Sequence, residues 1–277
     1  MYNQEKLLEV KNLNKTFHKG FSLINFLAHK KFIYNNIHIL EDISFDIHIN
    51  ECVGIFGKSG CGKTTLLYCI ARIIEPSSGT VIFDSENWLK LNSKQLRKKA
   101  KKMQIIFQDA YSFANPNYQV QQVLEEPLVI NFSMDKHTRL KLINTFLDMA
   151  KLQQSIKTKK INELSGGQRQ RINIIRAFIL KPKLILADEL TSFLDICLQF
   201  EILNMLTFFL KEFNSSCVLV SHDLRVLQHI CDKIIFMNDG KIIEIINTQD
   251  IGKSSNPQIK HILELFDSLK IRKTLKG

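Results

Sequence analysis

Hydrophobic and polar positions alternate along HILEDISFDIHI, the segment from His38 to Ile49. A period of two places every second side chain on the same face, which is typical of an antiparallel strand with one buried face. Val10–Phe17 is expected to form another strand. The stretch Lys19–Asn36 between the two carries no regular pattern, and we interpret it as an irregular insert.

Short apolar runs recur along the rest of the chain and predict buried strands. These runs are Glu51–Phe56, Gly79–Asp84, Met103–Phe107, Leu184–Ala187, Cys217–Val220 and Ile234–Met237. Segments with helical spacing lie between several of them, at Thr64–Ile73, Ile196–Phe213 and Leu224–Cys231. The turn Asn238-Asp239-Gly240 precedes a final strand at Lys241–Ile246. This alternation of strands and helices predicts an α/β fold with a mostly parallel sheet and helices on both faces.

The segment from about Val120 to Lys151 differs, because it carries helical spacing and no strand pattern. We expect a helical subdomain at about residues 109–165, inserted within one domain at residues 6–250. Residues 251–277 are expected to form a C-terminal extension, with a helix at Gln258–Lys270 and a basic tail. No internal repeat is visible.

The chain of 277 residues has no apolar stretch near the roughly 18 residues that a membrane span needs. The N-terminus lacks the layout of a signal peptide, so the protein is expected to stay in the cytosol. Its net charge of +11 fits either a lysine-rich solvated surface or contact with the anionic inner leaflet. The densest basic stretch, Arg97–Lys102, has no interleaved aromatic residues, and we expect no nucleic-acid partner.

Six cysteines are present, and none stands in a C-x-x-C pair that would indicate a zinc or redox site. Most are expected to be small core residues in a reducing compartment.

The run GKSGCGKTT matches the phosphate-binding pattern G-x-x-x-x-G-K-[ST], and it lies between an expected strand and an expected helix. In this pattern the backbone N–H groups face a phosphate chain, the lysine reaches the β- and γ-phosphates, and the hydroxyl after the lysine binds Mg²⁺. The expected nucleotide-binding residues are Gly57, Lys58, Ser59, Gly60, Cys61, Gly62, Lys63, Thr64 and Thr65. Oriented N–H groups and Lys63 would favour the thiolate of Cys61.

Two adjacent carboxylates, Asp188 and Glu189, follow the apolar strand Leu184–Ala187. Downstream of a phosphate-binding loop, Asp188 is expected to hold Mg²⁺ together with Thr64. Glu189 is the candidate general base that polarises the attacking water.

The pentapeptide Leu164–Gln168 (LSGGQ) supplies a second anion-binding helix start, because a hydroxyl, backbone N–H groups and a helix dipole meet there. The alternative is that Ser165 only caps the helix Gln170–Leu180. A cap alone does not call for the glycines or for Gln168. We expect Ser165, Gly166, Gly167 and Gln168 to contact nucleotide.

With this pentapeptide the chain resembles the ATP-binding subunits of the ABC transporter family, over roughly residues 7–265. The resemblance implies a P-loop NTPase fold with an antiparallel β-subdomain and a helical subdomain. It also implies that ATP and Mg²⁺ bind, and that the LSGGQ segment closes over ATP held by a second ABC ATPase subunit, identical or different.

Further positions match the family in order along the chain. Gln108 in IIFQD corresponds to the glutamine that senses Mg²⁺ and the membrane partner. Asp195 in SFLD lies in the segment that follows the catalytic carboxylates. His222 in VSHD corresponds to the histidine that contacts the γ-phosphate. Phe17 stands where an aromatic ring stacks on adenine, although a core role is equally compatible with the sequence.

Two positions depart from the family pattern. Leu190 replaces the usual proline after Glu189, and Phe193 replaces a small residue. Neither change removes a catalytic group, but Phe193 is expected to alter packing between the two subunits of a dimer.

The insert at 19–36 and the segment FQDAYSFANPNYQVQQVLEEPL are similar to the nickel, dipeptide and oligopeptide importers. The runs GKSGCGKTT, LDICLQ and HDLRVLQHICDKIIFMNDGKIIE are most similar to nickel-import ATPases. The resemblance implies two multi-span permease subunits, a substrate-binding protein and a peripheral position at the cytoplasmic face of the inner membrane. Di- or oligopeptides remain an alternative cargo.

A soluble ABC ATPase acting on nucleic acid or ribosomes is the competing class. Such proteins usually carry two cassettes or a long coiled-coil insert, and this sequence shows neither.

Overall fold

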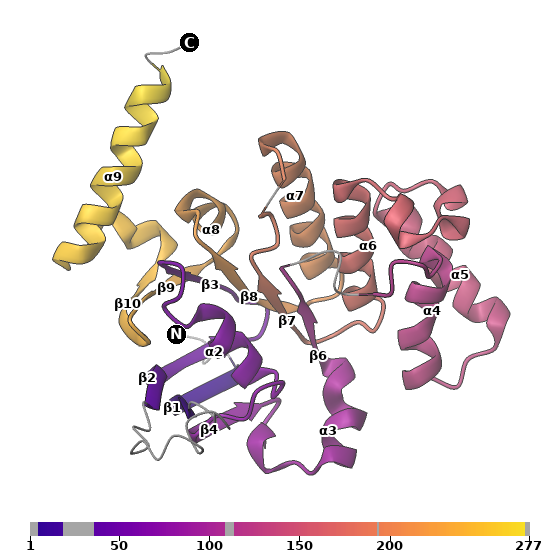
Figure 1. The fold of residues 1–277 in the computed structure, drawn as a ribbon, viewed down its shortest axis with the longest axis horizontal. Helices are drawn as coiled ribbons and strands as arrows, with labels where there is room; N and C mark the ends of the chain where they lie inside the picture. The colour runs from indigo at the N-terminus through magenta and orange to yellow at the C-terminus, as the bar shows by residue number, and fades with distance from the viewer. Residues whose placement is uncertain (1–4, 19–35, 109–113, 193, 275–277) are drawn as a thin grey trace, which may run out of the picture.

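The computed structural model describes residues 5–18, 36–108, 114–192 and 194–274, with two sheets and a helical region beside them (Figure 1). The four-stranded sheet is antiparallel, in the order β2-β1-β4-β5. Its strands are β1 (Lys6–His18), β2 (Asn36–His48), β4 (Ser78–Phe83) and β5 (Glu86–Asn87). The alternation seen in HILEDISFDIHI is therefore confirmed as an antiparallel strand. The expected insert at 19–36 lies almost wholly outside the described residues.

The six-stranded sheet has the order β10-β9-β3-β8-β7-β6, and all neighbours are parallel except β10 and β9. Its strands are β3 (Cys52–Gly57), β6 (Met103–Ile106), β7 (Leu184–Asp188), β8 (Ser216–Ser221), β9 (Lys233–Asn238) and β10 (Lys241–Asn247). The predicted α/β fold with a mostly parallel sheet is confirmed.

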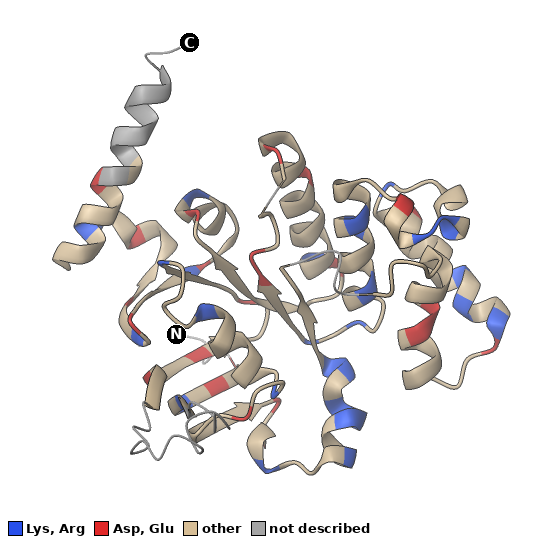
Figure 2. Cartoon of the chain, viewed as in Figure 1, with Lys and Arg blue, Asp and Glu red and all other residues tan. Residues whose placement is uncertain are grey.

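Eight α-helices are assigned within the described residues. They are α2 (Lys63–Ile70), α3 (Ser93–Lys99), α4 (Val120–Asn131), α5 (Lys136–Met149), α6 (Gly166–Phe178), α7 (Ile196–Glu212), α8 (Leu224–Ile230) and α9 (Pro257–Thr274). Helix α2 is shorter than predicted, because the chain turns at Arg72, whose φ is +58°. The basic stretch 97–102 begins in α3 and ends in a 3-10 turn, and Figure 2 shows the clustered Lys and Arg residues there.

The inner strands β3, β7 and β8 of the central sheet are buried on both faces, which explains their continuous apolar runs. Along β7, Ile185 and Ala187 face the core formed with α4 to α8, whereas Leu184 and Leu186 face the core formed with α2 and the antiparallel sheet. Successive side chains of a strand point to opposite faces, so one apolar run serves two cores.

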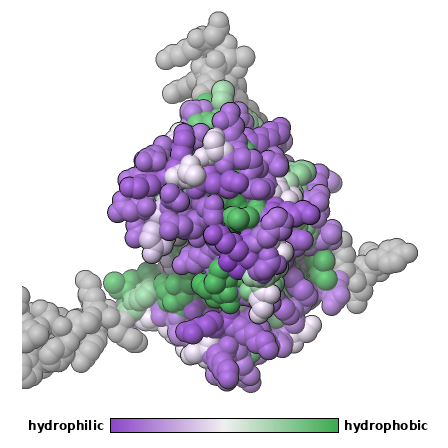
Figure 3. Space-filling model, turned by 90° about the vertical axis from the view of Figure 1, so that its right-hand side faces the viewer, coloured by the Kyte–Doolittle hydropathy of each residue, from purple (hydrophilic) through white to green (hydrophobic). Residues whose placement is uncertain are grey.

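The segment from α4 to α6 is helical, as its spacing predicts, and lies at one end of the molecule (Figure 1). Figure 3 views the molecule from this end and shows a mostly hydrophilic surface with an apolar patch below its middle. Our division of the chain into a cassette at 6–250 and an extension from 251 stays a prediction. In the described part of the chain, no helix has both the length and the apolar character that a membrane span requires.

Candidate functional site

The candidate site lies at one edge of the central sheet, where the carboxyl ends of four parallel strands meet. Strand β3 ends at the phosphate-binding loop, β6 is followed by Gln108, β7 ends at Asp188, and β8 is followed by His222. Because neighbouring parallel strands end at the same edge, residues far apart in the sequence are brought together. Ligands of open α/β sheets generally bind at this edge.

The phosphate-binding loop depends on glycine where the backbone turns. Gly62 has φ +103°, and a Cβ there would lie 2.7 Å from the carbonyl oxygen of Ile39. Gly62 is also the N-cap of α2, which has no side-chain cap, so the first N–H groups of the helix face the loop. Lys63 is buried, and its Nζ donates hydrogen bonds to the carbonyl oxygens of Gly57 (2.8 Å) and Lys58 (2.9 Å). The loop is therefore wrapped around an ammonium group.

Lys58, Ser59 and Gly60 are exposed at the top of the loop. Thr64 is exposed as well, and Thr65 is half-buried beside it. The arrangement leaves the loop accessible to a phosphate chain from its outer side.

Thr64 and Asp188 are brought into direct contact, although 124 positions separate them: the Thr64 hydroxyl donates a hydrogen bond of 3.1 Å to Asp188 Oδ1. Asp188 is almost fully buried. Burial raises the pKa of its carboxyl above the ordinary value. The hydrogen bond from Thr64 and the charge of Lys63 both lower this pKa, whereas the charge of Glu189 raises it further. The pKa of Asp188 remains raised overall. Two hard oxygen donors side by side form the kind of pair that Mg²⁺ prefers.

Glu189 is contacted from three sides. Its Oε2 accepts hydrogen bonds of 2.9 Å from Gln108 Nε2 and 2.9 Å from the Ser192 hydroxyl. The Nδ1 of His222 lies 3.5 Å from the same oxygen. The backbone at Glu189 has φ +42°, which is unusual for a residue other than glycine. Such a conformation persists where the surroundings hold it, here through the bond from Glu189 N to the Val220 carbonyl (3.1 Å).

The pentapeptide Leu164–Gln168 forms the start of α6, which begins at Gly166 rather than at Gln170. The Ser165 hydroxyl accepts from Gln168 N, and Gln168 Oε1 accepts from Ser165 N, both at 3.2 Å. This reciprocal capping box uses Gln168, so our interpretation that a cap requires only Ser165 was wrong. The cap does not involve Gly166, at which an added Cβ would meet only Leu194, at 3.8 Å.

Buried polar side chains of α6 hold both the pentapeptide and the loop after Glu189. Arg169 donates to the carbonyl oxygens of Ile161 and Leu164, and Gln170 Nε2 donates to that of Leu190 at 2.9 Å. Leu190 is itself buried in the core, so it fills the position where the family has proline. Phe193 lies outside the described residues.

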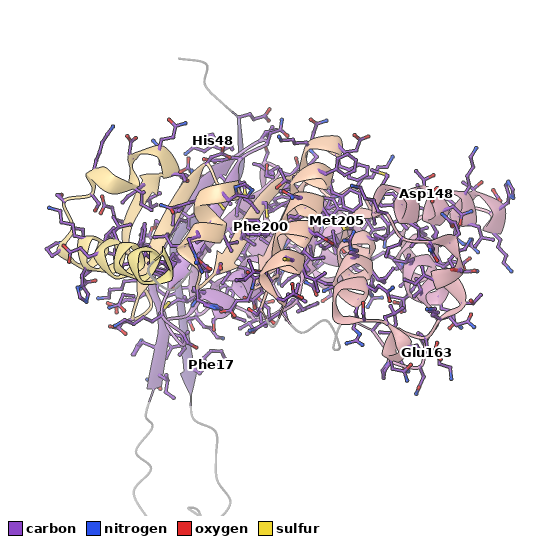
Figure 4. The ribbon with its side chains drawn as sticks, turned by 90° about the horizontal axis from the view of Figure 1, so that it is seen from above. Phe17, His48, Asp148, Glu163, Phe200 and Met205 are labelled. Atoms are coloured by element: carbon purple, nitrogen blue, oxygen red, sulfur yellow. The ribbon has the colours of Figure 1, made fainter. Side chains whose placement is uncertain are left out.

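Asp195 caps α7, because its carboxylate accepts from Leu198 N at 3.0 Å. Phe17 is 38% exposed near the end of β1, with Lys15 Nζ 4.6 Å from its ring centre, which excludes the alternative of a core role. Figure 4 shows Phe17 and Glu163, the residue next to the pentapeptide, on one side of the molecule and His48 on the opposite side.

The expected thiolate at Cys61 is not supported. Cys61 is 6% exposed and packs in the core beneath the loop, close to Gly57. Burial raises the pKa of this thiol, and that effect outweighs the attraction of Lys63. Its side chain is therefore a core residue, and only its backbone faces the loop.

Sequence reasoning missed the contact between Ser192 and Glu189. The two are three residues apart, and Ser192 N donates to the Glu189 carbonyl at 3.0 Å in a turn. The sequence does show a hydroxyl residue, Ser192, three positions after the candidate base. It predicts a contact with Glu189 only when the chain is known to turn between the two residues.

The comparisons with known proteins agree with this geometry. A family model described as ABC transporter matches residues 40–192. The chain belongs to the ABC transporter family. It is an ATP-binding subunit of that family, because the matched region holds the phosphate-binding loop and both carboxylates.

Relatives of this ABC protein have import-related names. A putative peptide import ATP-binding protein of Brucella ovis is 35% identical over 84% of this chain and 74% of its own length. The oligopeptide transport ATP-binding protein AppF of Bacillus subtilis is 32% identical over 97% of this chain and 80% of its own length. The nickel import ATP-binding protein NikE of Shigella boydii is 34% identical over 81% of this chain and 84% of its own length.

Two solved structures have a similar fold. The ATP-binding cassette MJ0796, a dimer in a post-hydrolysis state with ADP and phosphate, has a TM-score of 0.75 and 30% identity, over 87% of this chain and 98% of that one. The protein cbiO1 of Clostridium perfringens, part of the transporter complex cbiONQ, has a TM-score of 0.75 and 25% identity, over 94% and 100%.

Proposed function

We propose that this chain hydrolyses ATP to energise an ABC importer, and that the imported cargo is nickel. The observation that carries the proposed hydrolysis is the Glu189 carboxylate, held at the end of β7 by Gln108 and Ser192 and next to the Thr64–Asp188 pair. A fixed carboxylate at hydrogen-bonding distance from a bound water acts as a general base.

Each residue around the site has its own proposed role in ATP hydrolysis. Lys63 and the N–H groups of the loop bind and orient the β- and γ-phosphates, and His222 contacts the γ-phosphate beside Glu189. Glu189 takes up a proton from the attacking water, and Gln108 and Ser192 keep its Oε2 in place. Phe17, exposed at the edge of β1, offers an aromatic face for adenine.

Mg²⁺ fits the oxygen donors of this site, and Thr64, Asp188 and Gln108 would hold it. When bound, it would neutralise charge on the β- and γ-phosphates.

The proposed assembly contains a second ABC ATPase subunit, two multi-span permeases and a substrate-binding protein, at the cytoplasmic face of the inner membrane. The dimeric MJ0796 cassette supports the paired arrangement. In it, Ser165, Gly166, Gly167 and Gln168 of one subunit would face ATP on the other, with Asp195 near the contact. Val129 and Ile130, near the end of α4, are adjacent exposed apolar residues that would be available for contact with a permease.

The cargo is proposed from similarity to nickel-import ATPases, including NikE. Di- or oligopeptide import is the second candidate, because the Brucella protein and AppF match over comparable lengths.

Uptake of radiolabelled nickel and of a radiolabelled peptide by a deletion strain tests the proposed function. We expect nickel uptake to be lost, restored by the wild-type chain and by the exposed control Lys136→Ala, and not restored by Lys63→Ala. Excess nickel should rescue growth that depends on nickel enzymes. Normal nickel uptake with lost peptide uptake would replace nickel by peptide as cargo, and normal uptake of both would contradict an importer role.

A further inference from the structure

Three buried cysteines lie together at the edge of the central sheet opposite the candidate site. Cys52 begins β3, Cys217 is its neighbour in β8, and Cys231 follows the last residue of α8. This edge adjoins His48, whose carbonyl accepts from the Ser216 hydroxyl, on the side of the molecule away from Phe17 (Figure 4). ATP hydrolysis as proposed uses none of the three thiols.

We propose that Cys52 and Cys231 form a modification site, a dithiol that hydrogen peroxide converts to a disulfide and that thereby slows ATP hydrolysis. The Sγ atoms of the two residues are 3.5 Å apart, whereas a disulfide has an S–S length of about 2.05 Å.

The backbone already holds these two residues side by side. Asp232 N donates to the Cys52 carbonyl at 2.8 Å, and Cys52 N donates to Asp232 Oδ2 at 2.8 Å. Closing the bond therefore requires the two sulfurs to approach each other by about 1.5 Å.

The surroundings distinguish the roles of the two sulfurs. Thiol contacts with Cys217 and Cys231 lower the pKa of Cys52, and they outweigh the opposing effects of burial and of the Asp232 and Glu51 charges. Burial raises the pKa of Cys231, which stays a thiol. Cys52 also lines a cavity whose lining does not include Cys231, so a small oxidant reaches the Cys52 sulfur first. Cys52 is therefore assigned as the nucleophile and Cys231 as the resolving partner.

The reaction balances with peroxide as the oxidant. The Cys52 thiolate attacks one peroxide oxygen, the O–O bond breaks, and the departing hydroxide takes a proton to become water, which leaves a sulfenic acid. Cys231 sulfur then attacks Cys52 sulfur, an S–S bond forms, and the sulfenic oxygen leaves as a second water with the thiol proton. Two thiols are oxidised and one peroxide is reduced to two waters.

A small oxidant has a route to Cys52. A cavity of about 300 Å³ is lined by Cys52, Asn50, Ser215, Ile230 and Asp232, among others. A water molecule occupies about 30 Å³ in the liquid, so the cavity admits peroxide easily.

The bond would connect two elements that lead to the catalytic edge. Strand β3 ends at the phosphate-binding loop, and α8 begins two residues after His222. A shift of α8 moves His222 relative to Glu189, and a displacement of about 1 Å in a catalytic group can cost up to 10²-fold in rate. We therefore expect a fall in kcat of at least about fivefold, with nucleotide affinity little changed.

The test uses the full-length chain, treated with dithiothreitol or with hydrogen peroxide. Mass spectrometry after proteolysis measures the Cys52–Cys231 cross-link, and phosphate release measures kcat. We expect the cross-link and the loss of kcat to appear together and to reverse with dithiothreitol. Cys231→Ala should abolish both effects, and Cys52→Ala repeats the test from the other sulfur. The control Cys197→Ala, which removes an exposed thiol elsewhere in the chain, should keep the cross-link.

Failure to form this cross-link, or a loss of kcat that persists in Cys231→Ala, overturns the inference. The readout rests on the proposed ATP hydrolysis, and the two fail separately. If the chain reduced with dithiothreitol does not hydrolyse ATP, the proposed function is contradicted. If the reduced chain hydrolyses ATP but peroxide produces no Cys52–Cys231 cross-link, only the proposed dithiol is contradicted.

Discussion

The side-chain amide of Gln108 donates a hydrogen bond of 2.9 Å to Glu189 Oε2. This bond joins the residues that follow β6 and β7, two neighbouring parallel strands. A second bond of 2.9 Å reaches the same oxygen from Ser192. The direction in which Glu189 faces is thus set by two donors from separate segments.

Ser192→Ala should lower kcat by about tenfold and leave KM for ATP nearly unchanged, because a hydrogen bond to a charged group contributes about 1.5–3 kcal/mol and Ser192 contacts no nucleotide in our proposal. Steady-state phosphate release measures both constants. Ser155→Ala, which changes an exposed serine outside the candidate site, is the matched control. An unchanged kcat in Ser192→Ala would remove Ser192 from the positioning of Glu189.

Asp188→Asn should stabilise the nucleotide-free chain while abolishing Mg²⁺-dependent hydrolysis. The folded pKa of Asp188 is raised, so its ionisation destabilises the native state at a pH above that value. The gain should be on the order of 1 kcal/mol at neutral pH, or about 2–4 °C in Tm. It should fade as the pH falls below the ordinary value for aspartate, where the carboxyl is protonated in both states.

Thermal melts across this pH range check the prediction for Asp188. Asp148→Asn, at an exposed carboxylate on α5, serves as the control and should show no such trend. A lower Tm for Asp188→Asn at neutral pH would mean that the charge stabilises the empty site.

Cys61 should react slowly with a maleimide at neutral pH in the native chain, since burial raises its pKa and covers the sulfur. Cys197 is exposed and should label first. A mass-spectrometric time course separates the two sites. Rapid labelling of Cys61 that MgATP prevents would restore the reactive thiolate that its sequence position indicates.

The fold was largely predictable because its signals are local. The alternation in β2 and the apolar runs of β3, β7, β8 and β9 depend on which faces of each strand are buried. Such a pattern can be recognised from a few consecutive residues of the sequence. The positions of Lys63, Asp188 and Glu189 relative to the strands followed from the same runs. The family assignment is confirmed by a match over residues 40–192.

Other features were not predictable because they depend on tertiary contacts. The thiol of Cys61 points into a core that the sequence does not display, so oriented N–H groups and Lys63 suggested the wrong protonation state. The cap formed by Gln168 required the actual start of α6. The proximity of Cys52 to Cys231 arises from the pairing of β3 with the segment before β9, 179 positions later.

Glu189→Gln tests the central claim most directly, because it removes the proposed base and keeps the shape of the side chain. The measurement is ADP formation by the purified chain at saturating MgATP, with nucleotide binding determined in parallel and Glu212→Gln, an exposed position at the end of α7, as control. Our account predicts normal ATP binding, hydrolysis slower by about 10²-fold or more, and accumulation of an ATP-bound dimer. Near-normal hydrolysis by Glu189→Gln would contradict the assignment of Glu189 as the general base.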